Sequence, residues 1–122
     1  MTGQEQLQEL TASGEGFIHP IDPVMDREPA GALLLARAAA IRNATQAALR
    51  QVAAPLAAAI GPSAADAIER DLVPRSYEFV HHRQVIAESR TDPSDKGAQY
   101  RVEVVVAFDL RALQAELVRH RR

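Results

Sequence analysis

The stretch "ARAAAIRNATQAALRQVAAPLAAAI", residues 36–60, has alanine at almost every second position and constrains the fold more than any other part of the chain. Alanine favours the α-helix more than any other residue, so the stretch predicts a long helix that begins near Ala30. Because alanine side chains let another backbone come close, we expect this helix to lie tightly across a sheet. The expected buried face carries apolar and small side chains: Leu34, Ala38, Ile41, Ala44, Thr45, Ala48 and Val52.

Proline and glycine mark where the helices should stop. Pro55 removes a main-chain donor, so we expect the long helix to kink or restart there. Gly61, which a second proline follows, should end it. Ser63 is expected to cap a short second helix over residues 64–73, and Pro74 should stop that helix.

The clearest strand signal is "AQYRVEVVVAFD" at residues 98–109, where apolar and polar residues alternate. Residues 76–90 predict a second strand that includes Tyr77 and Phe79. The composition of residues 91–97 is typical of a loop, so the two strands should form an antiparallel hairpin.

Three further segments complete the chain. Residues 11–21 mix β-forming residues with Gly14 and Gly16, which suits a first strand with a bulge or at a sheet edge. Residues 22–29 hold two prolines in a polar context and indicate a loop. Asp109 should cap a last helix. The apolar stripe of that helix comprises Leu110, Leu113 and Leu117.

These elements predict an α+β fold in the order β-α-α-β-β-α. An antiparallel sheet of about three strands should carry the long alanine-rich helix and the shorter helices on one face. We expect residues 1–10 to form a polar tail and residues 11–122 to form a single domain. With 23 alanines and five aromatic residues, the core should be thin and leave room for a partner subunit.

Composition and motifs argue against several kinds of function. The net charge of −2 argues against nucleic-acid binding, and the absence of cysteine excludes disulfides and thiolate metal sites. No apolar run is long enough to span a membrane. Adjacent strand residues point to opposite faces, so His81 and His82 cannot hold one metal ion together. No catalytic constellation or phosphate loop is present, and we therefore expect no enzyme activity, no cofactor and no metal.

A series of spaced residues carries a family resemblance. The helix pattern comprises Ala36, Arg37, Ala40, Asn43, Ala44 and Ala48, and the last strand and helix continue it with Tyr100, Val102, Val104, Asp109, Leu113 and Leu117. Over about residues 11–118, the chain resembles the N-terminal domain of the flagellar assembly protein FlgT and the related outer-membrane lipoprotein domain of FlgP. The resemblance implies an exported, non-enzymatic part of a ring or disk around the flagellar motor, or an envelope lipoprotein.

We therefore expect a structural assembly module that forms a homo-oligomeric ring or disk in the cell envelope or at the flagellar motor, with other envelope or flagellar proteins as possible partners. Its expected location is the periplasm or the outer membrane if a leader was removed, and the cytoplasm otherwise. The candidate interface comprises Arg37, Arg42, Asn43, Gln46, Arg50, His81, His82 and Arg83. The alternative is a ligand-binding or sensing domain whose cleft between the long helix and the hairpin is lined by Tyr77, Phe79 and Tyr100.

Overall fold

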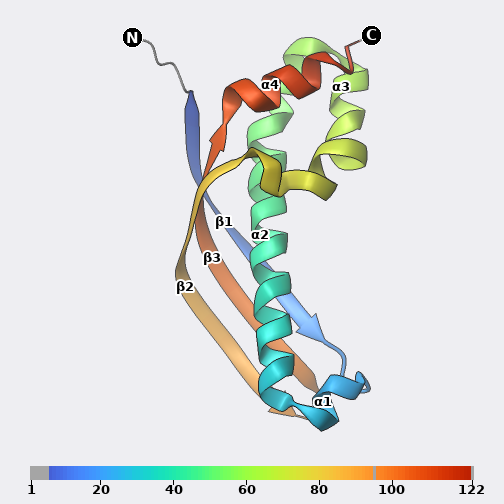
Figure 1. Ribbon diagram of the computed structural model, residues 1–122, viewed down its shortest axis with the longest axis vertical. Coiled ribbons are helices and arrows are strands. Elements are labelled where there is room, and N and C mark those ends of the chain that lie inside the picture. Colours follow the sequence, from blue (N-terminus) through green and yellow to red (C-terminus); the bar gives the residue numbers. More distant parts are fainter. Residues whose placement is uncertain (1–5, 95, 122) are drawn as a thin grey trace. The chain divides into compact units, whose positions relative to one another are not determined.

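The computed structural model describes residues 6–94 and 96–121 (Figure 1). Its elements follow in the order β1 (Leu7–Ile18), α1 (Pro23–Arg27), α2 (Pro29–Ile60), α3 (Pro62–Ala67), the π-helical turn η1 (Ile68–Leu72), the 3-10 turns η2 (Val73–Phe79), β2 (Val80–Ser94), β3 (Gly97–Asp109) and α4 (Leu110–Val118). The strands form one antiparallel sheet in the order β1-β3-β2, and the first half of α2 packs against the part of it that lies in the same unit. The predicted α+β class is confirmed.

The chain divides into two compact units, which we describe separately. The helical unit has the described residues 6–10, 46–83 and 106–121, and the sheet unit has residues 11–45 and 84–105. Both units draw on distant parts of the chain, because α2 and all three strands contribute residues to each. The prediction of a single domain over residues 11–122 stays a prediction.

In the sheet unit, β1 and α2 approach each other through glycine and alanine. Ala36, Ala40 and Ala44 recur every four residues along α2, and all three are fully buried. A Cβ atom on Gly16 would lie 1.9 Å from the main-chain oxygen of Ala36, and one on Gly14 would lie 2.3 Å from that of Ala40. The edge position predicted for this strand is confirmed, and its glycines are required by the close approach of the helix backbone.

The predicted buried face of α2 is wrong in part. Leu34 is 69% exposed and Ala38 is exposed, whereas Ala48 and Val52 are buried as expected. The difference arises because the buried stripe follows the alanines at four-residue spacing, and Leu34 lies on the opposite side of the helix from Ala32. The smallest side chains, not the largest, therefore define the packed face in the sheet unit.

The helical unit corrects the expected helix boundaries. Pro55 lies inside α2, which continues to Ile60 without restarting. Gly61 ends the helix as predicted, with a φ of 150° that only glycine adopts readily. Ser63 is not the cap of the next helix, because α3 begins at Pro62 with Gly61 as its N-cap and no side-chain cap bond.

The predicted strand over residues 76–90 begins and ends too early. Tyr77 and Phe79 lie in η2, and β2 begins only at Val80. Phe79 is buried, and the Arg75 guanidinium lies 5.5 Å from its ring centroid, so these contacts hold the segment in helical turns. Pro74 has no N–H to donate and cannot extend the preceding helical ladder.

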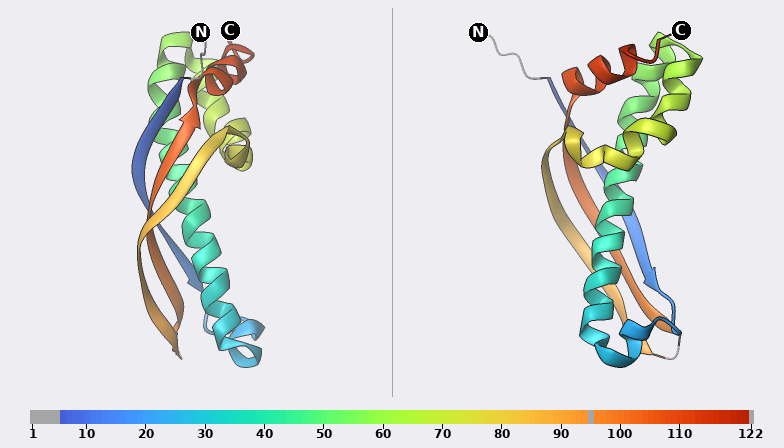
Figure 2. Two further views of the ribbon diagram at one scale, coloured as in Figure 1. Left: turned by 60° about the vertical axis from the view of Figure 1, so that its left-hand side comes forward. Right: turned by 45° about the vertical axis from the view of Figure 1, so that its right-hand side comes forward.

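The hairpin itself is confirmed, although its predicted loop is wrong (Figure 2). β2 runs to Ser94 and β3 starts at Gly97, so residues 91–94, which were expected in the loop, belong to the first strand of the hairpin. An edge strand tolerates the proline in this segment because one side of its ladder faces no neighbour. Gly97 has a φ of 98°, which explains why glycine starts the second strand.

Both ends of the described chain are fixed in the helical unit. Asp109 caps α4 as predicted, because its carboxylate accepts from the N–H groups of Arg111 and Ala112. The Leu110 N–H donates to the main-chain oxygen of Gln6 (2.9 Å), and β1 begins at Leu7. Residues 7–10 thus belong to a strand and not to the expected tail, while residues 1–5 lie outside the described residues.

Within the described part of the chain, none of the helices combines the length and apolar character that a membrane crossing requires.

Candidate functional site

The most exposed regular element of the sheet unit is β2. Every β2 residue from 84 to 91 is exposed except Val85, which is half-buried. The neighbouring strand β3 differs, since Val102 and Val104 are buried. Exposure of successive residues means that both faces of this part of β2 are largely open, because successive side chains point to opposite faces. The contact with α2 described below is the pair of Arg37 and Glu88. β2 also lies at the edge of the sheet, and the described residues place no strand beyond it.

The opposite edge strand, β1, is protected by α2. The Asn43 side-chain amide donates to the main-chain oxygen of Glu15 at 2.7 Å, so a helix side chain already occupies an acceptor of this strand. The helix backbone also lies directly over Gly14 and Gly16. A covering helix is one of the devices by which proteins shield a sheet edge from pairing. The two edges of the sheet are therefore not equivalent.

A cluster of three polar side chains joins α2 to the hairpin. Arg37 donates to both carboxylate oxygens of Glu88, at 2.8 Å from Nε and 3.3 Å from Nη2. The Tyr100 hydroxyl donates to the same carboxylate. Two hydrogen bonds lower the pKa of Glu88 to about 2: the bond from Arg37 has the larger effect, and the bond from Tyr100 the smaller. The bonded carboxylate in turn raises the pKa of Tyr100.

This cluster predicts a pH-dependent contribution to stability. A carboxyl whose pKa falls on folding stabilises the protein fully above its ordinary pKa of 4.5, and loses that contribution as the pH falls through about 2. Both Arg37 and Glu88 are more than one third exposed, so solvent screening limits the effect to about 1 kcal/mol or less. We expect Glu88→Gln to lower the free energy of unfolding at neutral pH, and the difference from wild type to vanish towards about pH 2.

Urea denaturation of wild type and Glu88→Gln across this pH range measures the effect. Glu103→Gln, which changes an exposed carboxylate of β3, is the matched control and should differ little from wild type. A Glu88→Gln difference of the same size at neutral and at strongly acidic pH would contradict the assignment.

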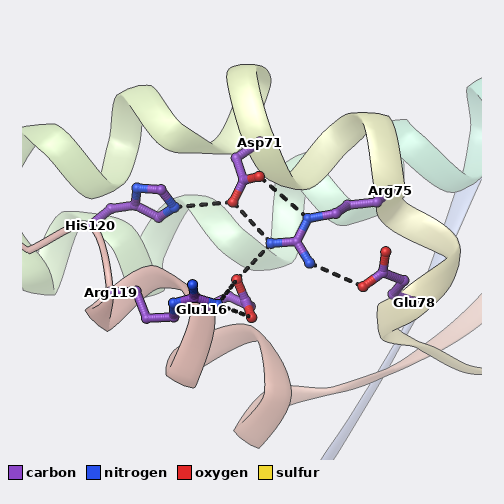
Figure 3. Close-up of polar contacts among 6 residues, drawn as sticks. All are labelled: Asp71, Arg75, Glu78, Glu116, Arg119 and His120. Carbon is purple, nitrogen blue, oxygen red and sulfur yellow. Dashed lines mark hydrogen bonds and ion pairs between the residues drawn. The ribbon is translucent and has the colours of Figure 1, made fainter.

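A second polar network lies in the helical unit and is centred on Arg75 (Figure 3). Arg75 donates to Asp71 (2.9 Å from Nη2 to Oδ2), to Glu78 (3.0 Å) and to Glu116 (2.6 Å). These bonds connect η1, η2 and α4 through one guanidinium. The hydrogen bonds from Arg75 lower the pKa of Asp71 and of Glu116, and the carboxylates raise the pKa of Arg75.

The end of α4 extends the same network. The His120 ring nitrogen Nε2 lies 3.0 Å from Asp71 Oδ2, and Arg119 donates to Glu116 at 3.2 Å. The six side chains labelled in Figure 3 therefore form one network: Arg75 binds three carboxylates, and two of these also bind Arg119 and His120. Each of these groups has a partner within the chain, and the network connects η1, η2 and α4.

Removing the central guanidinium should destabilise the helical unit. We expect Arg75→Met to lower the free energy of unfolding by about 2 kcal/mol, because three carboxylates lose a charge-assisted partner that is only 28% exposed. Thermal and urea denaturation measure the loss. Arg70→Met changes an exposed arginine of η1 and should alter stability by less than about 0.5 kcal/mol. Equal effects of the two substitutions would contradict a central role for Arg75.

The structure places the predicted interface residues in several settings. Arg37 and Asn43 make the contacts described above, and Arg50 pairs with Glu69 at 2.6 Å. Gln46 donates to the main-chain oxygen of Val73 at 3.5 Å. The remaining predicted residues are all exposed, one on α2 and three on β2: Arg42, His81, His82 and Arg83. Whether the eight residues meet another subunit stays a prediction.

Sequence reasoning missed Glu88, Glu69 and Arg75. Glu88 lies 51 positions from Arg37, so only knowledge of the packing between helix and hairpin could pair them. Arg75 and Asp71 are four residues apart, a spacing that indicates an ion pair on a helix, but the segment after Pro74 was expected to be extended.

Of the three residues predicted to line a cleft between the long helix and the hairpin, Tyr100 alone lines the cavity that lies there. Tyr77 is 71% exposed and Phe79 is buried, and both precede the hairpin, so that lining is wrong. The sheet unit instead has an open cavity of about 390 Å³ between α2 and the hairpin. Its lining residues are Ala30, Leu33, Leu34, Arg37, Arg90 and Tyr100. Among residues 6–94 and 96–121, no three histidine, aspartate or glutamate side chains gather closely enough to hold a metal ion.

Comparison with known proteins adds no relative: no family model, no curated protein and no solved structure matches the chain.

Proposed function

We propose that the chain is a non-enzymatic assembly module that associates with copies of itself. The observation that carries this proposal is the exposure of β2 in the sheet unit, where residues 84–91 present both faces and a sheet edge to solvent. Long exposed edges readily pair with another strand, and soluble monomers usually shield them. On the opposite edge strand, α2 covers one face and occupies the main-chain acceptor of Glu15, so β2 is the more open of the two edges.

The side chains of β2 support association with a protein partner. Ile86 is 49% exposed and Ala87 is exposed in the same segment, so pairing would bury apolar surface as well as main-chain hydrogen-bonding groups. The polar clusters around Glu88 and Arg75 are already paired within the chain, which favours a structural role over acid–base chemistry.

We further propose a ring or disk of the cell envelope or flagellar motor as the assembly to which the chain contributes. The support is the resemblance carried by Ala36, Arg37, Asn43 and the alternating valines of β3. Two of these residues make specific contacts: Arg37 binds Glu88, and Asn43 binds β1. These residues therefore contribute to the packing of α2 on the sheet, and a stable fold is a requirement for any assembly domain.

Light scattering coupled to size exclusion tests the proposal. We expect a mass above that of the 13.3 kDa chain at high protein concentration, and a lower mass on dilution. Ile86→Lys should shift the distribution towards monomer, because a lysine on an edge strand opposes pairing. Gln114→Lys, an exposed substitution on α4, is the control for added charge. A strict monomer at several hundred micromolar would contradict the proposal.

The cavity of about 390 Å³ favours a second candidate function, the binding of a small amphiphilic anion. Its wall combines Leu33 and Leu34 with Arg37, so the apolar body of a ligand would meet the leucines and its carboxylate head would compete with Glu88 for Arg37. Titration with octanoate, followed by amide chemical shifts, tests this function. Saturable shifts at Leu33 and Leu34 with octanoate and none with acetate would support it, while no shifts with either would contradict it.

A further inference from the structure

We propose that two copies of the chain pair through β2, with the strands antiparallel and a two-fold axis at Ile86. The inference rests on the proposed function, because it names the contact by which self-association occurs. It uses residues 84–88 of the sheet unit, whose sequence is Gln-Val-Ile-Ala-Glu. All five belong to the edge strand, and Val85 is the one that is not exposed.

The choice of β2 follows from the difference between the two sheet edges. β1 carries α2 directly over its glycines and already accepts a hydrogen bond from Asn43 at Glu15. β2 lies on the other side of β3, where residues 84–91 are open to solvent. A two-fold contact uses the same surface on both copies, so one open edge is sufficient for it. Pairing one edge with the other would require the shielded strand as well.

The side chains select the register. Directly opposed residues of antiparallel strands lie on the same face, and their side chains touch. A two-fold at Ile86 sets Ile86 against its own copy, Val85 against Ala87, and Gln84 against Glu88, whose carboxylate stays bound to Arg37 and Tyr100. Apolar side chains then meet apolar ones, and no unpaired charge is brought into the contact.

Neighbouring registers are less favourable. A two-fold at Glu88 would oppose two carboxylates of like charge, which destabilises a strand pair. A two-fold at Ala87 would oppose Ile86 to the carboxylate of Glu88. Pro93 gives an independent constraint, because it has no N–H to donate to a partner strand. Pairing centred on Ile86 overlaps residues 80–92 and leaves this proline outside the paired segment.

The contact sets a rule for larger assemblies. An isologous contact closes with two copies and cannot extend by itself. A ring or disk built from this chain would therefore consist of β2-paired dimers joined by a second surface, and its number of chains would be even.

Disulfide trapping tests the register cleanly, because the chain has no cysteine of its own. At the two-fold axis the opposed Cα atoms lie about 5 Å apart, within disulfide reach, so Ile86→Cys should form a covalent dimer on mild oxidation. Ser89→Cys is the matched control on the same exposed strand. Its two copies would lie about 20 Å apart along the pair and should cross-link at least roughly tenfold more slowly.

A second readout leaves Ile86 in place. In an equimolar mixture of Val85→Cys and Ala87→Cys chains, intact-mass analysis should find mixed dimers well above homodimers, since these positions oppose each other. The expected pattern is therefore self-linking at position 86 and cross-linking between positions 85 and 87.

The outcomes separate the two proposals. Equal cross-linking of Ile86→Cys and Ser89→Cys, or no enrichment of mixed dimers, overturns the register. If no cysteine variant cross-links while light scattering still gives oligomers, the β2 contact is wrong and self-association stands. If wild type is monomeric at every concentration, both proposals fall.

Discussion

Replacing Gly16 by alanine should lower the free energy of unfolding by about 3 kcal/mol or more. The new Cβ atom would lie 1.9 Å from the main-chain oxygen of Ala36 and 2.8 Å from the main-chain nitrogen of Ala40. Neither atom can rotate away, because both belong to the backbone of α2, and the helix would have to move off the strand. Equilibrium denaturation in urea measures the loss, and the amide spectrum shows whether the sheet unit still folds.

Gly31→Ala is the matched control for this substitution. Gly31 lies in α2, and an added Cβ would meet no main-chain atom closely; its nearest contact would be Glu28 Cβ at 3.2 Å, which a shift of a few tenths of an ångström relieves. Alanine in place of glycine inside a helix stabilises by up to about 1 kcal/mol, so this variant should be neutral or more stable than wild type. Similar destabilisation by both substitutions would contradict the close approach of α2 to β1.

Replacing Phe108 by alanine should lower the free energy of unfolding by about 3 to 5 kcal/mol. Phe108 is one of five aromatic residues and the largest of the fully buried side chains, so its replacement by alanine leaves a cavity in the core. With a total stability of about 5 to 15 kcal/mol for a protein of this kind, the variant should be partly unfolded at moderate temperature.

Phe17→Ala provides the comparison for Phe108→Ala. Phe17 is also an aromatic residue on a strand, but it is 52% exposed. Its removal should cost less than about 1.5 kcal/mol, because only part of the ring is buried. Thermal denaturation of both variants measures the difference. Equal losses would mean that the core does not depend on Phe108.

The sequence predicted the strongly patterned elements correctly. Alternation identified β3, where Val102, Val104 and Phe108 are buried, and alanine content identified the long helix. These signals are local, so they survive without knowledge of the tertiary structure. The failures concern residues whose environment is set by distant contacts. Leu34 is exposed because the alanine column provides the packing surface.

The segment around Tyr77 and Phe79 illustrates the second kind of failure. Aromatic residues favour strands, but Arg75 gathers carboxylates from η1 and α4 and stacks on Phe79, which holds the segment in 3-10 turns. The partners of Arg75 come from as far as 41 residues away in the sequence. A single-sequence pattern contains no information on such contacts.

For the candidate site, the sequence predicted polar residues on α2 but not the partners that they bind. The sequence also predicted association through an exposed strand edge, and that remains a prediction. Arg37, Asn43 and Arg50 turned out to bind groups of the same chain. The difference between β1 and β2 depends on the position of α2 on the sheet. The helix lies against Gly14 and Gly16, but these two glycines do not by themselves identify the helix as their neighbour.

Amide hydrogen exchange as a function of protein concentration tests the central claim most directly. If copies meet through β2, those amides of residues 84–91 that point away from β3 should exchange about tenfold or more slowly at roughly 500 µM than at roughly 5 µM, while those of β1 stay unchanged. Exchange in residues 84–91 that is equally fast at both concentrations would show that β2 remains exposed in every copy, and would contradict the account.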